Sequence, residues 1–307
     1  MVEILMVYVS GVQKMLDVTL KSFARHDAGY PYRLKIVTDV RDIRASNEVF
    51  QLEGYDIRAS YDVGVAASSS GQHSRLLDEA AKDTTDELLL SMDSDCFPVA
   101  DGWLKKLVDM QTPSVATSGV LWPWCPPVAD MNPKTIEWKI RRQHCWNNTQ
   151  VACQLIRTKL MRDMGWKFGD PEGDDTGFGL MDKAHIAGMQ VVGLMPTRCP
   201  LPDVGITDFD PEYNRFESII FGDMIYHHVG ATRENCGEVK GKEAIFTASR
   251  KRVIDEEGAE WMLKPGNSHV FKMDQEESVA QFKMQMLLRS AVWFLEKNNT
   301  LFGGGWV

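Results

Sequence analysis

The sequence has few features of a secreted, membrane-spanning or nucleic-acid-binding protein. Its six cysteines include no CxxC pair and no zinc-ribbon or disulfide-framework spacing, so we expect six reduced thiols. Basic residues are outnumbered 34 to 43, and the resulting net charge of −9 argues against a general binder of nucleic acid or anionic membranes. No apolar run has the length or flanks of a signal peptide or a spanning helix. These absences predict a cytoplasmic protein with no transmembrane segment.

The composition is that of a protein with a full hydrophobic core. The chain has 307 residues, of which 44% are hydrophobic and 25% charged. Single cores stop growing near roughly 250–300 residues, so one principal domain with a smaller appendage is expected. No internal repeat or low-complexity tract interrupts the chain.

Short apolar strands alternate with amphipathic helices along most of the chain. Val12, Leu16, Leu20 and Phe23 recur at helical spacing after a first strand, for example. The strands are predicted at 3–9, 33–38, 55–59, 87–92, 114–120, 151–157, 190–194 and, as one strand, 219–229. Further helices are predicted near 71–81, 103–108, 160–164, after 175, and at 249–263 and 275–297, with irregular chain after Pro196. Such alternation predicts an α/β fold with a parallel sheet that binds ligands at the carboxyl ends of its strands.

The most informative residues are Asp93 and Asp95, which flank Ser94 where the apolar strand Leu88-Leu89-Leu90 ends. Two carboxylates at positions i and i+2 can turn together toward a hard divalent cation, which prefers oxygen ligands and keeps open positions for phosphate. A pair of aspartates in a solvated turn would look the same in isolation. The position after a buried strand favours the metal site.

Several motifs around this triplet follow the order found in one enzyme family. Residues 88–98 and the following Gly102-Trp103-Leu104 resemble the hydrophobic strand, DxD, proline and GWL helix of GT-A fold glycosyltransferases, especially family 2. Arg75 before Leu76-Leu77, residues 153–166, and the GEDxDL-like block 173–180 resemble further segments of that family. Residues 227–233 resemble both the HLGGAS segment of some rhamnosyltransferase-like members and the HxxGxxK segment of retaining enzymes. The resemblance covers about residues 1–233.

This resemblance implies a Rossmann-like, mostly parallel central sheet flanked by helices. It places a nucleotide-sugar-binding and catalytic domain at 1–235, and we expect a C-terminal helical extension at 236–307. The implied activity is metal-dependent transfer of a sugar from a UDP- or GDP-sugar to a hydroxyl acceptor. A glycan is the favoured acceptor, and a hydroxylated DNA base is the alternative.

The implied site has three parts. Asp93, Asp95 and His227, with His228 as the alternative histidine, would hold Mn²⁺ or Mg²⁺, because carboxylates and a neutral imidazole suit such ions. Asp175 is the expected general base, with Asp174 as second candidate, although two aspartates at a helix start can also be caps. The expected donor-binding residues are Ser10, Asp39, Arg75, Ser94 and Arg233.

Other interpretations stay open at this stage. A glycine stands at position 177, where the family often has an acid, so retaining chemistry competes with the favoured inverting chemistry. A nucleotidyltransferase of similar fold is disfavoured, because the Gly-rich, Arg-containing signature after the first strand is absent. A non-catalytic sugar-binding scaffold is disfavoured by the joint presence of the acids, Arg75 and His227.

Overall fold

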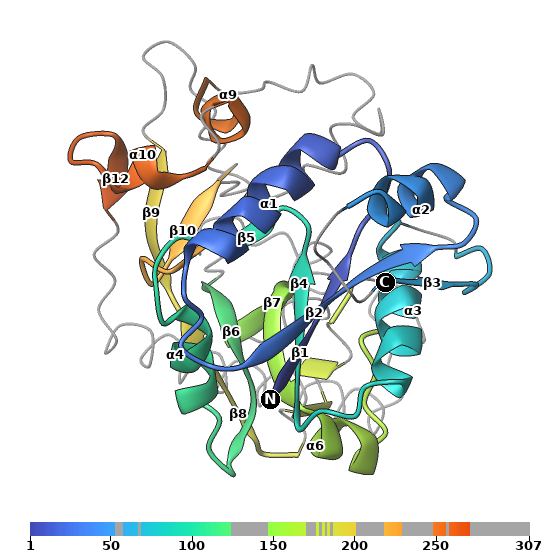
Figure 1. Cartoon of the computed structure of the whole chain (residues 1–307). Coiled ribbons are helices and arrows are strands. Elements are labelled where there is room, and N and C mark those ends of the chain that lie inside the picture. Colours follow the sequence, from blue (N-terminus) through green and yellow to red (C-terminus); the bar gives the residue numbers. More distant parts are fainter. Residues whose placement is uncertain are drawn as a thin grey trace, which may run out of the picture.

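The described part of the chain forms two β-sheets with helices packed around them (Figure 1). The computed structural model describes residues 1–52, 58–66, 69–123, 147–169, 176–177, 180–181, 183–184, 187–200, 218–228, 248–255 and 258–270. The helix predicted at 275–297 lies outside these residues.

Within these ranges, the larger sheet has seven strands and is mostly parallel. Their order across the sheet is β3 (Arg58–Tyr61), β2 (Tyr32–Asp39), β1 (Val2–Val7), β4 (Leu88–Asp93), β7 (Asn147–Arg157), β6 (Val115–Pro123) and β8 (Gln190–Leu194). Only β7 runs antiparallel to its neighbours, β4 and β6. The predicted fold class, a mixed α/β protein with a mostly parallel central sheet flanked by helices, is confirmed.

The central strands are apolar because both faces of the sheet are covered. Along β1, Ile4 and Met6 enter one core, whereas Leu5 and Val7 enter the other. The first core also receives side chains of α1 (Gln13–Arg25), α2 (Ile43–Phe50) and α4 (Trp103–Asp109), and the second those of α3 (Ser69–Lys82) and α6 (Thr158–Asp163). Each fully buried aliphatic side chain contributes about 1.5–3 kcal/mol, so the alternation fixes the register of these strands.

The smaller sheet is antiparallel and lies beside α1, at the upper left of Figure 1. Its strands, in order, are β12 (Ser268–Val270), β9 (Pro196–Pro200), β10 (Ile219–Phe221), β11 (Ile225–His227) and β5 (Cys96–Pro98). The prediction of one strand over 219–229 is wrong, because β10 and β11 form a hairpin. The prediction of irregular chain after Pro196 is also wrong at β9, which pairs with β10 and β12.

The described part of the C-terminal segment packs onto the first core. It contains α9 (Ala248–Asp255), α10 (Glu260–Leu263) and the strand β12. Val253, Trp261 and Met262 belong to the same buried cluster as α1. The single helix predicted over 249–263 is therefore two helices, and the domain boundary at 235 stays a prediction.

At the amino edge of the larger sheet, a buried carboxylate holds three segments together. Glu3 accepts hydrogen bonds from Arg33 Nη2 at 3.2 Å and from Thr84 Oγ1 at 3.2 Å, and Lys35 Nζ lies 3.7 Å from it. Arg33 also donates to Asp86 at 2.7 Å. The side chains of Glu3 and Lys35 are both buried, whereas that of Arg33 is 38% exposed, so the cluster lies at the rim of the sheet with its carboxylate inside and has a structural role.

We expect Glu3→Ala to lower the free energy of unfolding by about 2–4 kcal/mol, because it leaves the buried Lys35 ammonium without its carboxylate. Glu79→Ala is the control: it removes an exposed pair with Lys82 and should cost about 0.5 kcal/mol or less. Urea denaturation of the two variants measures both values. Equal stabilities would contradict a structural role for Glu3.

Candidate metal centre

The carboxyl ends of three parallel strands meet at one edge of the larger sheet. Val7 on β1 pairs with Val37 on β2 and with Asp93 on β4, so these strand ends are in line. Asp39 ends β2 two residues further on. Ligand sites of open α/β sheets form at this edge. The predicted residues Ser10, Asp39, Asp93 and Asp95 all follow or end these strands.

The turn that carries Asp93 and Asp95 is held from both sides. Asp93 is the last residue of β4, and β5 begins at Cys96. On one side, Thr19 Oγ1 of α1 donates a 2.7 Å hydrogen bond to the Ser94 carbonyl. On the other, the backbone N–H of His228 donates to the Asp95 carbonyl at 3.0 Å. Ser94, which was predicted to contact the nucleotide-sugar donor, is buried, and its carbonyl accepts the hydrogen bond from Thr19.

His227 reaches these carboxylates because of the β10–β11 hairpin. Gly222 and Asp223 both have positive φ, +57° and +54°, and Met224 N donates to the Phe221 carbonyl at 2.9 Å, which is the geometry of a tight β-turn. The returning strand β11 pairs with β5, and His227 stands opposite Cys96. A residue of the smaller sheet is thereby placed next to the Asp95 side chain.

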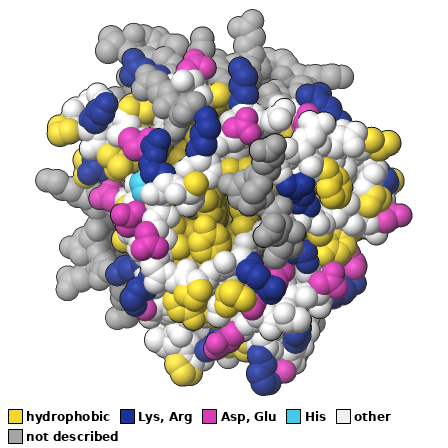
Figure 2. Space-filling model, viewed as in Figure 1, with side chains coloured by type: hydrophobic (Ala, Val, Ile, Leu, Met, Phe, Trp, Pro, Cys, Tyr) yellow, Lys and Arg dark blue, Asp and Glu magenta, His cyan; other side chains and the backbone are white. Residues whose placement is uncertain are grey.

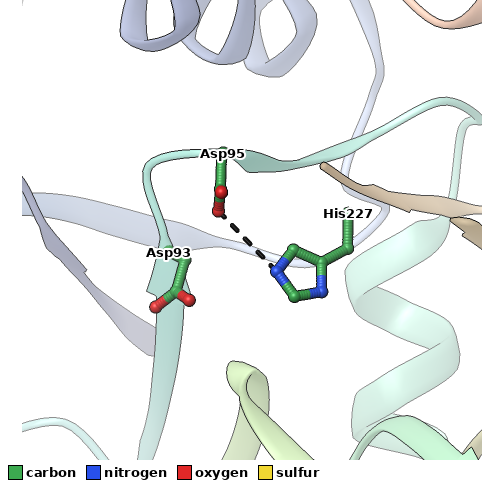
Figure 3. Close-up of side chains that lie close together, drawn as sticks. All are labelled: Asp93, Asp95 and His227. Atoms are coloured by element: carbon green, nitrogen blue, oxygen red, sulfur yellow. Dashed lines mark ion pairs between the residues drawn. The ribbon is translucent and has the colours of Figure 1, made fainter. Parts of the chain in front are cut away.

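Asp93, Asp95 and His227 form one group that can hold a metal ion. One ligand atom of each lies within 4.8 Å of those of the other two, and His227 Nε2 is 3.7 Å from Asp95 Oδ1 (Figure 3). The side chains of Asp95 and His227 are buried, and that of Asp93 is 28% exposed. The group therefore has an open side at Asp93.

The residues of this group fit a divalent cation of the manganese type. Two carboxylates and one imidazole offer the mixed oxygen and nitrogen ligands that suit Mn²⁺, and Mg²⁺ also accepts the carboxylates. Two neighbouring carboxylates repel each other unless a positive charge lies between them. Among the described residues, His227 Nδ1 is buried without a hydrogen-bond partner, so this imidazole is not held by an ordinary hydrogen-bond network of the core. A cation bound by Nε2 and the two carboxylates would relieve the repulsion between the carboxylates.

His228, the alternative histidine, faces away from the group. It is fully buried, and its Nδ1 is 2.7 Å from the hydroxyl of Tyr226. Neighbouring residues of a strand point to opposite faces, so only one of the two histidines can reach the carboxylates. Among the described residues, the structure brings together Asp93, Asp95 and His227.

Asp39 and Ser10 lie at the same edge but make contacts of their own. Arg41 donates to Asp39 Oδ1 at 2.9 Å, and Gln72 of α3 donates to Oδ2. The hydrogen bond from the Arg41 side chain holds the pKa of Asp39 below its usual value, so this carboxylate is ionised at neutral pH. The backbone N–H of Ser10 donates to Asp42 Oδ2 at 3.0 Å, and Asp42 also caps α2.

Arg75 points away from the carboxylates in this structure. Its Nη1 donates to the carbonyls of Val63 and Val65 at 3.4 and 3.0 Å. The side chain lines a cavity of about 570 Å³ between α3, α6 and residues 165–167. None of the three residues of the metal group lines this cavity.

The remaining predicted residues, Asp174, Asp175 and Arg233, lie outside the described residues. The chain directly after Asp175 is anchored: the hydroxyls of Thr176 and Ser74 are 3.2 Å apart, and Gly177 N donates to Phe168 O at 2.7 Å. The contact between Thr176 and Ser74 brings the residue after Asp175 to α3, at the position that follows His73 in the sequence.

His73 is a site residue that the sequence analysis missed. Its Nε2 lies 3.4 Å from Asp93 Oδ1. The sequence showed only that the helix begins near this residue, and the contact depends on how α3 lies across the end of β4. The sequence offered one signal for this role: His73 stands in the first turns of a helix that follows a strand of the sheet.

Comparisons with known proteins give structural similarity only. No family model matches the sequence, and no curated protein matches it significantly. The galactosyltransferase LgtC in complex with donor and acceptor sugar analogues is 11% identical, with 89% of this chain and 98% of that chain covered and a TM-score of 0.49. Mannosyltransferase PcManGT from Pyrobaculum calidifontis, in complex with GDP-Man and Mn²⁺, is 13% identical, with 62% of this chain covered and a TM-score of 0.44.

Mouse xyloside xylosyltransferase 1 is 15% identical over 60% of this chain and 76% of its own, with a TM-score of 0.37. The present chain spans 54% of the mannosyltransferase's length. None of the described helices combines the length and the hydropathy needed to cross a bilayer. Cys96, Cys153 and Cys199 are free thiols, as predicted; the other three cysteines lie outside the described residues.

We expect His227→Ala to weaken Mn²⁺ binding at least tenfold, because it removes the nitrogen ligand that faces Asp95. His228→Ala should instead lower stability and leave Mn²⁺ affinity within about twofold, since that side chain bonds to Tyr226. Titration of free Mn²⁺ by electron paramagnetic resonance, with a denaturation curve for each variant, separates the two. A larger loss of Mn²⁺ affinity in His228→Ala would assign the ligand to the other histidine.

Proposed function

We propose that this protein is a metal-dependent glycosyltransferase that moves a sugar from a nucleoside diphosphate sugar to a hydroxyl acceptor. The observation that supports this most is the convergence of Asp93, Asp95 and His227 at the carboxyl edge of the larger sheet. The open side of this group at Asp93 leaves room for the oxygens of a diphosphate. The order of sequence motifs, which resembles that of GT-A fold enzymes, agrees with this site.

The chemical demand of the reaction fits these residues. Negative charge develops on the diphosphate as it leaves the anomeric carbon, and a divalent ion held by Asp93, Asp95 and His227 would stabilise that charge without proton transfer. The side chains of Asp95 and His227 are buried. Strand pairing holds His227, and the hydrogen bond from His228 N holds the Asp95 carbonyl, so both residues need little reorganisation when they bind.

The donor's other parts would be bound by residues near this edge. Asp39, ionised and held by Arg41 and Gln72, is placed to accept hydrogen bonds from a ribose or a base, and the loop at Ser10 lies beside it. Arg75 would need to leave the Val63 and Val65 carbonyls to reach a diphosphate. Arg233 is proposed as a second diphosphate contact on the sequence resemblance alone.

Asp175 is the proposed general base of an inverting reaction, with Asp174 as the second candidate. The acceptor hydroxyl must lose its proton as it attacks, and a carboxylate on the far side of the sugar ring can take it. The contact of Thr176 with Ser74 supports this assignment. It holds Thr176, the residue after Asp175, near the turn of α3 in which His73 contacts Asp93.

A glycan is the favoured acceptor. On the face shown in Figure 2, described acidic and basic side chains are interspersed and not gathered by sign. The net charge of −9 also opposes binding to a phosphate backbone. A hydroxylated DNA base would need a basic surface, so it is the less favoured acceptor.

The test is hydrolysis or transfer from a panel of UDP- and GDP-sugars, with Mn²⁺, with Mg²⁺ or with a chelator. The wild type should release nucleoside diphosphate from one donor only in the presence of a divalent ion. Asp95→Asn should lose at least about a hundredfold in rate, because the metal supplies several kcal/mol of charge stabilisation.

Asp101→Asn is the matched control, since Asp101 is 75% exposed and outside the metal group. Asp101→Asn should release nucleoside diphosphate at the wild-type rate and with the same dependence on a divalent ion. Donor binding without turnover would favour the sugar-binding scaffold, and release of pyrophosphate from a nucleoside triphosphate would favour the nucleotidyltransferase. A chelator-resistant rate would refute metal dependence.

Asp175→Asn should lower the rate of transfer by about 10²–10⁴ while leaving the affinity for the nucleoside diphosphate unchanged, because a general base acts in the transition state. Single-turnover kinetics and a binding titration measure the two quantities. A greater loss in Asp174→Asn would move the base by one residue. Proton NMR of the anomeric product distinguishes inverting from retaining transfer.

A further inference from the structure

His73 approaches the metal group from a helix that supplies none of the three ligands. The residue lies in the first half of α3, and its Nε2 is 3.4 Å from Asp93 Oδ1. Its side chain is 22% exposed, so the contact is partly shielded from solvent. An imidazole at this distance from a carboxylate can hold it electrostatically and by hydrogen bonding.

The position of His73 is outside the group of ligands. Among the described residues, the group whose ligand atoms all lie within 4.8 Å of one another consists of Asp93, Asp95 and His227. His73 does not belong to it, although it is close to Asp93. His73 therefore lies beside one ligand of the group without being part of the group, which is the position of a ligand's partner.

Three consecutive residues of α3 contact three separate segments at this edge. Gln72 donates to Asp39 at the end of β2, His73 lies against Asp93 at the end of β4, and Ser74 contacts Thr176. The helix itself is fixed by Leu76 and Leu77, which are buried in the second core. The imidazole of His73 is thus carried by a rigid element and not by a loop.

We propose that His73 is a positioning residue, which holds the Asp93 carboxylate in the orientation that binds the metal. This inference rests on the metal centre of the proposed function. Asp93 needs such a partner more than Asp95 does, because Asp95 is buried, whereas Asp93 is 28% exposed at the end of its strand. The contact with His73 would oppose rotation of the Asp93 carboxylate toward water. Partners of this kind change metal affinity by about 10–100-fold when they are removed.

The experiment measures Mn²⁺ affinity by electron paramagnetic resonance on the full chain, with Mn²⁺ alone as the probe. His73→Ala should weaken binding about tenfold or more. His73→Gln, which keeps an N–H donor near Asp93, should recover most of that loss. Alanine favours helix at this position, so α3 is retained, and a denaturation curve for each variant verifies the fold.

A double-mutant cycle tests whether His73 acts through Asp93. In an Asp93→Asn background, His73→Ala should cause less than about a twofold further loss, because the carboxylate that it positions is already gone. His26→Ala is the matched control: His26 Nδ1 lies 3.5 Å from Asp101 Oδ1, a histidine–aspartate pair outside the metal group. It should leave Mn²⁺ affinity unchanged.

The outcomes separate this inference from the proposed function. A wild type that does not bind Mn²⁺ overturns both. If Asp93→Asn weakens binding but His73→Ala does not, the metal centre stands and the role of His73 is refuted. Equal losses from His73→Ala in both backgrounds would mean that the histidine acts independently of Asp93, which also refutes it.

Discussion

The pairing of β11 with β5 is the constraint on which the candidate site depends. Strand β5 continues directly from the turn that contains Asp93 and Asp95, so whatever pairs with β5 is brought beside these carboxylates. The hairpin turn at Gly222 and Asp223 sends the chain back at the length that puts His227 opposite Cys96. A shift of one residue in this register would exchange His227 for His228, because neighbouring strand residues face opposite sides. The hydrogen bond from His228 N to the Asp95 carbonyl, which joins the two segments, opposes that shift.

Charge is arranged differently at the two edges of the larger sheet. At the amino edge, Glu3 is buried and matched by Arg33, Lys35 and Thr84, so its charge is compensated within the protein. At the carboxyl edge, Asp93 and Asp95 lie together with two imidazoles nearby, His73 and His227. An acidic cluster of this kind is stabilised by a cation and is costly without one. The carboxyl edge is therefore the edge of the sheet whose charges would be stabilised by a bound cation.

Much of the larger sheet could be predicted from the sequence. The strands β1, β2 and β4 are short apolar runs, and amphipathic helices follow β1 and β2. This pattern is local, so it marks both strand type and order. The smaller sheet could not be predicted in this way. Its strands are as short as three residues, and one of its pairs, β11 with β5, joins segments more than a hundred residues apart. The one local signal was Gly222-Asp223, a turn pair within the segment that was predicted as a single strand.

The residues of the candidate site also differ in whether a local sequence pattern could identify them. Asp93 and Asp95 could be identified because they stand where an apolar strand ends, which is a local property. His227 was proposed from a resemblance of motifs, and its approach to Asp95 depends on the hairpin that the sequence analysis missed. His73 carries no motif of its own: its contact with Asp93 exists only because α3 crosses the end of β4.

The location of the metal group explains why it draws on both sheets. Asp93 ends a strand of the larger sheet, His227 ends a strand of the smaller one, and Asp95 lies in the turn between them. A cation bound by all three would link the two sheets at the point where the chain passes from one to the other. Since such an ion binds the folded arrangement and not the separated segments, its binding would stabilise this junction in proportion to its affinity. The same geometry that assembles the ligands thus couples occupancy of the centre to the packing of the smaller sheet against α1 and β4.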